Sequence, residues 1–185
     1  MSAESDAVKT VAGLMALAAR TAPKAVGIDS ITIEIVTGPD QGKIGDKMIQ
    51  IAAGNGMDFF RVNGEQVKAS DATVFIGVSG QKALGLNCGG CGYATCAEMA
   101  KACAAGKAKK TDYKGPNCAI KVTDLGIAVG SAVKTASIHN VDNRVMYSAG
   151  VAAMQLGMFK GCSIVYGIPL KASGRNMYFA APVEH

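Results

Sequence analysis

The sequence predicts an α+β protein, because patterns of both helix and strand occur along its 185 residues. Residues 31–36 alternate in the manner of a strand, and residues 72–78 form the continuous apolar run of a buried central strand. Long patterns rich in small apolar residues cover 120–137 and 141–156 and predict helices. Hydrophobic residues make up 49% of the chain, which is enough to bury a core in a single domain.

The first elements are a helix, a strand and a turn. Residues 4–20 place apolar side chains on one helical face, and Ser5 is a candidate N-cap. This helix ends before Pro23, because a proline disfavours helical conformation at the residue that precedes it. After the strand over 31–36, the sequence Gly38-Pro39-Asp40 predicts a turn.

The middle of the chain continues with four expected elements. Residues 45–53 predict a helix, and residues 59–67 predict a short strand or hairpin that turns at Asn63-Gly64. The buried strand over 72–78 follows. A further short helix is expected from Thr95 to about Ala105.

The last part of the chain predicts two helices and a strand. The helices over 120–137 and 141–156 are separated at 138–140. A final strand is expected over 162–167, closed by the turn-like sequence Gly167-Ile168-Pro169. No internal repeat or low-complexity linker separates these elements.

Four cysteines predict an iron-sulfur cluster. Cys88, Cys91 and Cys96 lie within nine residues, and Cys118 follows after a gap of 21 residues. Thiolate sulfur suits zinc and iron-sulfur clusters, and it disfavours magnesium and calcium. Interspersed glycines let backbone N–H groups approach the sulfur atoms, which stabilises a buried anionic cluster.

Zinc is the main alternative occupant. A structural zinc site with four cysteines usually has two short ligand pairs, whereas Cys118 stands alone here. A disulfide framework is less consistent still with a chain that can bury its own core. The two other cysteines, Cys103 and Cys162, are better explained as small buried apolar residues than as ligands.

The polar run over 139–144 has two interpretations. Asn140 or Asp142 can end one helix and cap the next by bonding to unpaired backbone amides. Alternatively, His139 and Arg144 can lie beside a cofactor or substrate as proton donor and anion partner.

Composition and charge limit the classes of partner. Tryptophan is absent and aromatic residues make up 5%, so we expect no nucleic-acid binding by base stacking. The basic run over 101–110 is either a solvated helix end or a docking patch for an acidic redox partner. No apolar run reaches the length of about 18 residues that spans a membrane. Glu4 and Asp6 near the N-terminus are unlike a secretory signal, so we expect a cytoplasmic protein without membrane contact.

Several segments carry a resemblance to known families. The stretch from Cys88 to Cys118 resembles the four-cysteine 4Fe-4S module of redox-complex subunits and of the iron-sulfur subunit of corrinoid proteins. Nearly the whole chain is similar to a family of uncharacterised ferredoxin-domain proteins of bacteria and archaea. The segments that carry this similarity are 18–24 (AARTAPK), 130–136 (GSAVKTA), 139–144 (HNVDNR) and 167–170 (GIPL).

That family in turn resembles a cluster-bearing variant of the nitroreductase fold. The resemblance implies one nitroreductase-like domain over 1–185, a layered sheet with helices, and an inserted cluster segment over 86–120. It also implies a homodimer with FMN at the subunit interface. The FMN phosphate would be held by Arg20 and Arg175, which match the family's two basic positions, together with Thr21 and Lys24.

Alternatives for these basic residues come from their local sequence. Arg20 can instead satisfy carbonyl groups at the end of its helix, and Arg175 can belong to a solvated loop. The familiar Arg-Arg-Ser entry of nitroreductases is replaced here by Ala19-Arg20-Thr21.

The function expected from these features is redox. The leading hypothesis is an iron-sulfur protein that transfers single electrons, either to a redox partner protein or as a flavin-dependent reductase. The alternative is a non-catalytic module in which the metal is a structural or sensing element. No motif in the sequence indicates which substrate the protein would act on.

Overall fold

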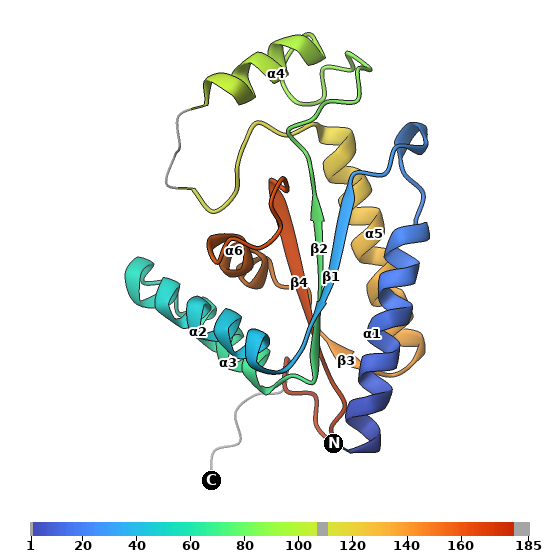
Figure 1. Ribbon diagram of the computed structural model, residues 1–185, viewed down its shortest axis with the longest axis vertical. Coiled ribbons are helices and arrows are strands. Elements are labelled where there is room, and N and C mark those ends of the chain that lie inside the picture. The colour runs from blue at the N-terminus through green and yellow to red at the C-terminus, as the bar shows by residue number, and fades with distance from the viewer. Residues whose placement is uncertain (1, 107–110, 180–185) are drawn as a thin grey trace.

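The computed structural model describes residues 2–106 and 111–179. Figure 1 shows a central sheet with helices on both faces, and a further segment with its own helix, α4, beyond one end of the sheet. This layered arrangement confirms the predicted α+β fold. The segment that carries α4 lies apart from the two layers of helices.

Within the described part of the chain, four antiparallel strands form one sheet in the order β1-β2-β4-β3. Every residue of β2 is buried, because this strand lies between two others and has helices above and below it. The strands predicted over 31–36 and 72–78 are therefore confirmed. The strand bounds are Ile31–Val36 (β1), Ala72–Val78 (β2), Asp142–Asn143 (β3) and Ile164–Lys171 (β4).

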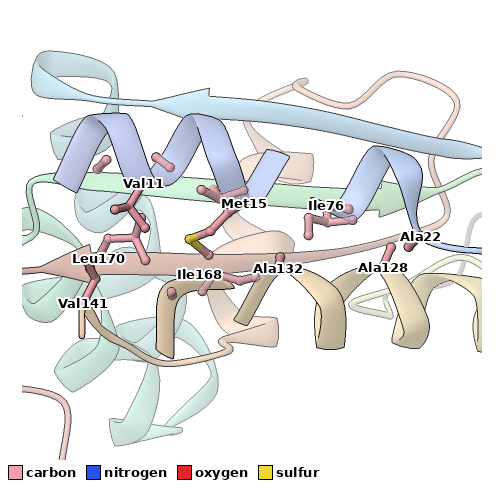
Figure 2. Close-up of a cluster of buried hydrophobic side chains, with 14 of the residues drawn as sticks. Val11, Met15, Ala22, Ile76, Ala128, Ala132, Val141, Ile168 and Leu170 are labelled. Carbon is pink, nitrogen blue, oxygen red and sulfur yellow. The ribbon is translucent and has the colours of Figure 1, made fainter. Parts of the chain in front are cut away.

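Helices α1 (Ala3–Thr21) and α5 (Ala119–Ile138) cover one face of the sheet. Figure 2 shows their apolar side chains meeting those of β2 and β4, with Met15 and Ala132 in the same cluster as Ile168. The predicted helices over 4–20 and 120–137 are thus confirmed with small changes of bounds. The N-cap of α1 is Ser2, not Ser5, because Ser2 Oγ accepts the Ser5 N–H at 3.3 Å.

Helices α2 (Gly38–Asn55), α3 (Asp58–Ala69) and α6 (Tyr147–Gln155) cover the other face. Their side chains form a second core cluster with Phe75 and Val165. Helix α6 packs on the main chain of β4 itself, since a Cβ on Gly150 would lie 1.7 Å from the Val165 carbonyl oxygen. Only glycine permits that approach.

Two predicted turns are wrong because they lie inside longer elements. Gly38 and Pro39 begin α2, where the missing N–H of proline is not needed. Gly167-Ile168-Pro169 lies within β4, which continues to Lys171. Glycine fits position 167 because a Cβ there would come within 2.7 Å of Ala149 Cβ on α6. This sequence therefore reflects close packing and not a turn.

The predicted strand or hairpin over 59–67 is also wrong, because these residues lie in α3. The Asn63 side chain is buried, and its Nδ2 donates a hydrogen bond to Ser148 Oγ at 2.9 Å. A Cβ on Gly64 would lie 2.8 Å from the Gly45 carbonyl oxygen, so glycine lets α2 and α3 cross closely.

The helix predicted over 141–156 is shorter than expected. Residues 142–143 form β3 and Met146 pairs with Gly167 as an isolated bridge, so α6 begins only at Tyr147. Asn140 has a φ of 54°, the left-handed conformation that commonly follows a helix end. The predicted separation of the two helices at 138–140 is therefore confirmed.

Helix α4 (Cys96–Ala105) confirms the short helix expected after Thr95. Thr95 Oγ1 accepts the Glu98 N–H at 3.2 Å, and the Glu98 carboxylate accepts the Thr95 N–H at 3.4 Å. This reciprocal capping fixes where the helix begins, immediately at Cys96. Among the described residues, no helix is both long and apolar enough to cross a membrane.

Candidate metal centre

The candidate ligands lie at the end of the molecule beyond β2. Cys88 and Cys91 belong to the loop before α4, Cys96 is the first residue of α4, and Cys118 is the N-cap of α5. Cys88 is exposed, Cys91 and Cys96 are half-buried, and Cys118 is buried. The site is thus open to solvent on one side and attached to the core on the other.

Two of the thiols lie at helix N-termini. The first N–H groups of a helix have no intrahelical partner, and the helix dipole is positive at that end. Both effects make the starts of α4 and α5 favourable places for the negative charge of a bound metal-thiolate group. The Cys118 N–H donates to the Gly80 carbonyl at 2.8 Å and so fastens the start of α5 to the residues that follow β2.

Asn87 closes the loop that carries Cys88 and Cys91. Its backbone N–H donates to Cys96 Sγ at 3.4 Å, and its side-chain oxygen accepts the Cys96 N–H at 2.8 Å. Asn87 adopts a φ of 47°, a conformation that asparagine tolerates better than most residues. The two ends of the loop are therefore joined by an N–H···S hydrogen bond, a contact of the kind that iron-sulfur sites use.

Gly90 brings this loop against α5. A Cβ at Gly90 would lie 3.3 Å from Ala119 Cβ and 3.7 Å from Cys88 Sγ. The residue after Cys118 is therefore a neighbour of the loop that carries Cys88, although the two lie far apart in sequence. The start of α5, which carries Cys118, thus lies beside the loop that carries Cys88 and Cys91.

The sulfur atoms are not arranged as a complete coordination site. Within residues 2–106 and 111–179, no three Cys, His, Asp or Glu side chains form a group that could hold a metal ion. The donor chemistry nevertheless fits an iron-sulfur cluster, because four thiols share one region and Gly89 and Gly92 have φ values of 73° and 84°. The assignment of the four cysteines as ligands stays a prediction.

Lys121 and Asp124 were not identified from the sequence. Both lie on the first turns of α5, with only 5% and 2% of their surfaces exposed. Burial lowers the pKa of Lys121, and its electrostatic interaction with Cys118 opposes that change. Asp124 Oδ1 accepts the Ala25 N–H at 3.0 Å, whereas Oδ2 is buried without a partner among the described residues. A sequence signal existed, since both charges share the helical face of Leu125 and Ala128.

The two remaining cysteines differ from each other. Cys162 is buried in the second core cluster, as predicted. Cys103 is only half-buried, and its Sγ donates to the Pro116 carbonyl at 3.4 Å. Burial raises the pKa of Cys103, so it stays a neutral thiol beside the candidate ligands.

The predicted flavin residues at the end of α1 are engaged within the chain. Arg20 forms an ion pair with Asp29 and donates to the Ile31 carbonyl at 2.8 Å. Lys24 Nζ donates to the Ala19 carbonyl at 2.9 Å and to the Arg20 carbonyl, and thereby caps α1. Thr21 Oγ1 donates to the Leu17 carbonyl at 3.0 Å.

Arg175 is distant from these residues. Arg20 contacts Ile31, which pairs with Val78 at one end of the sheet, whereas Arg175 lies beyond the end of β4, where Leu170 pairs with Ala72. Within one chain, the four candidate flavin residues therefore occupy opposite ends of the sheet. A site that uses all of them would need two copies of the chain.

The polar run over 139–144 holds the C-terminal segment in place. Arg144 donates to the Tyr178 carbonyl at 3.2 Å and stacks over Phe179 at 5.3 Å from the ring centroid. Asp142 accepts from Asn176 Nδ2 at 2.9 Å. In the basic run over 101–110, Lys101 is exposed on α4, and the other lysines (Lys107, Lys109 and Lys110) lie outside the described residues.

Comparison with known families supports the sequence resemblance. The family "Uncharacterized protein containing a ferredoxin domain" (DUF2148) matches residues 114–180, and a family described as an Fe-S cluster matches residues 85–112. An uncharacterised protein of Archaeoglobus fulgidus is 43% identical over 176 residues, a match that covers 95% of this chain and 92% of that protein.

The solved structures that resemble this fold include flavin oxidoreductases. Nitroreductase CinD from Lactococcus lactis, in complex with nicotinic acid, aligns with a TM-score of 0.60 and 12% sequence identity. The alignment covers 96% of this chain and 81% of the CinD chain. The NADPH:FMN oxidoreductase of Vibrio harveyi, complexed with NAD+, aligns with a TM-score of 0.54 and 13% identity over 90% of this chain. This chain spans only 60% of the Vibrio protein. These matches show a nitroreductase-like fold.

Proposed function

Because the chain belongs to the family of uncharacterised proteins that contain a ferredoxin domain, we propose that it is an iron-sulfur redox protein. In this proposal Cys88, Cys91, Cys96 and Cys118 hold one 4Fe-4S cluster, which, when bound, accepts and gives up one electron at a time. The observation that carries the proposal is the meeting of the Cys88 loop with the start of α5 at Gly90. This contact supports a shared site, because it brings the start of α5, which carries Cys118, beside the glycine-rich loop that carries Cys88.

The chain supplies the environment that such a cofactor requires. The N-termini of α4 and α5 provide unpaired N–H groups, and the Asn87 N–H already donates to Cys96 Sγ. The ammonium of Lys121 adds a buried positive charge near Cys118, which stabilises the more negative, reduced state of a bound cluster. Cys88 is the exposed ligand, so electrons would enter and leave on its side.

The principal test is anaerobic reconstitution with iron and sulfide. We expect broad absorption at about 400 nm and about four irons per chain. The Cys91→Ser variant should lose most of this iron, whereas Cys103→Ser, a matched control in the same segment, should retain it. A wild-type protein that binds zinc and no iron would contradict the proposal.

The alternative is a structural or sensing metal in a module without redox activity. The two core clusters favour the redox proposal, because neither includes any of the four candidate ligands. A fold with its own core does not need the metal to stay folded. The Cys91→Ser variant is therefore expected to keep the far-ultraviolet circular dichroism of the wild type. Unfolding of this variant would favour the structural alternative.

We also propose that two copies of the chain bind FMN between them. Apolar side chains are exposed on the outer surfaces of α1 and α5, where Leu17 and Ile138 have 59% and 63% of their surfaces exposed. Covering these side chains with a second copy would bury apolar surface, and it could supply Arg175 from the opposite end of the sheet to Arg20. The relatives of similar fold that are named as FMN proteins support this proposal only by analogy.

Light scattering and flavin titration test this second proposal. A dimeric mass and quenching of FMN fluorescence are expected for the wild type, with weaker quenching for Arg20→Ala. A monomeric mass, or equal quenching by both proteins, would contradict it. A cytoplasmic location and an acidic redox partner that docks near Lys101 complete the proposal.

A further inference from the structure

A cavity of about 690 Å³ lies between the segment that carries α4 and the connection from α6 to β4. This volume is within the range of about 300–1,000 Å³ that is typical of small-molecule sites. Neither the candidate cluster ligands nor the candidate flavin residues are among its described lining residues. The cavity is thus separate from both proposed cofactor sites.

The inner wall of the cavity is apolar. It is formed by Met154, Met158, Phe159 and Cys162, the last two of which are buried. The ring of Phe159 packs against Phe75 of the central strand, with centroids 5.6 Å apart. Because Phe159 is anchored in the core, this wall is already formed in the absence of a ligand.

Two cations are present in the lining. Lys114 and Lys160 are exposed, and neither side chain forms an ion pair or hydrogen bond with a described residue. The carboxylate in the described lining belongs to Asp112, which accepts a hydrogen bond from the Tyr147 hydroxyl at 3.3 Å. The cavity therefore combines an apolar wall with two positive charges that form no ion pair with a described residue.

The opposite wall belongs to the cysteine segment. Tyr93 lies on the loop between Cys91 and Cys96, and Cys103 lies on α4. The Cys103 thiol interacts electrostatically with Cys91. The cavity therefore adjoins the segment that carries the proposed cluster ligands.

We propose that this cavity binds a small organic anion, with an apolar body against Met154, Met158 and Phe159 and a carboxylate, sulfonate or phosphate group near Lys114 and Lys160. Binding of the anion stands on the cavity alone. Its significance as a ligand next to a redox centre rests on the proposed iron-sulfur function.

The test uses anilinonaphthalene sulfonate, which combines an apolar ring system with one anionic group. Isothermal titration calorimetry of the cluster-loaded protein should show one site per chain. Ala102→Trp, which places an indole in the cavity from α4, should weaken binding at least about tenfold, because it removes the space that the ligand occupies. Ala104→Trp is the matched control, since Ala104 is exposed on the same helix outside the cavity lining, and it should bind as the wild type does.

A second pair of measurements tests the charge requirement independently of packing. Lys160→Glu should weaken binding of the sulfonate about fivefold, as for the loss of an exposed ion pair. N-phenylnaphthylamine, which has the same rings without the sulfonate, should bind more weakly to the wild type and should be unaffected by this variant. Equal binding of the sulfonate by wild type, Ala102→Trp and Lys160→Glu would overturn the inference.

Iron analysis of the same samples separates this inference from the proposed function. If the wild type lacks iron but binds the sulfonate, and Ala102→Trp binds it weakly, the iron-sulfur proposal is refuted and the cavity inference is upheld. If the wild type holds the cluster and Ala102→Trp binds the sulfonate as tightly as the wild type does, the iron-sulfur proposal is upheld and the cavity inference is refuted.

Discussion

Replacing Gly150 with alanine is expected to destabilise the protein strongly, because α6 packs there on the main chain of β4. The added Cβ would lie 1.7 Å from the Val165 carbonyl oxygen and 2.4 Å from its carbonyl carbon. Neither atom can rotate away, since Val165 pairs with Gly77 inside the sheet. Helix α6 would therefore have to move outward and loosen the buried packing around it.

The magnitude follows from that overlap. Inserting a methyl group into a well-packed core lowers the free energy of unfolding by about 1–3 kcal/mol. The Gly150 contact is severe enough that we expect a loss of about 3 kcal/mol. Small proteins unfold in urea with a slope of about 2 kcal/mol per molar, so the midpoint should fall by about 1.5 M. Such a loss is a large part of the stability of a domain, about 5–15 kcal/mol.

The assay is urea unfolding followed by circular dichroism, at a fixed content of bound metal. Gly42→Ala in α2 is the matched control, because a Cβ there meets no atom within 4 Å. Removing a glycine from the interior of a helix should stabilise it by about 0.5–1 kcal/mol. The two substitutions should thus have opposite signs. A loss below about 0.5 kcal/mol in Gly150→Ala would refute the packing argument.

Two further predictions concern charge. Lys121→Met should lower the reduction potential of the reconstituted cluster, because it removes a buried positive charge near Cys118, whereas Lys134→Met, in the exposed surface of α5, should not; equal potentials in protein-film voltammetry would contradict this. Asp29 is partly desolvated, which raises its pKa, but the Ile31 N–H and Arg20 lower that pKa overall. The stability that this carboxylate contributes is therefore present above its unfolded-state pKa of about 4 and lost as pH falls through the lower folded value. The melting temperature of Asp29→Asn should accordingly fall less steeply than that of the wild type as the pH drops below about 4. Parallel plots of melting temperature against pH would exclude the ion pair as a source of acid sensitivity.

Local turn chemistry misled the sequence-based prediction where tertiary packing used the same residues. Asn63-Gly64, Gly38-Pro39 and Gly167-Ile168-Pro169 all resemble turns, yet they lie in α3, α2 and β4. Gly64 and Gly167 are glycines because another element approaches their backbone, at Gly45 and Ala149. A single sequence contains no signal that separates a glycine needed for a turn from one needed for close packing.

The sequence by itself determined the strands over 31–36 and 72–78, the helices over 4–20 and 120–137, and the choice of the four candidate thiols. Apolar periodicity is a local property that reflects which face of an element is buried, so it persists in the fold. Cysteine spacing is also local, and it predicts a soft-metal site from the chemistry of sulfur alone. Tertiary structure alone decided that Gly90 meets Ala119 and that the cavity opens beside Lys114 and Lys160. These contacts join residues far apart in the chain, and their distances depend on how the layers pack, which no local pattern encodes.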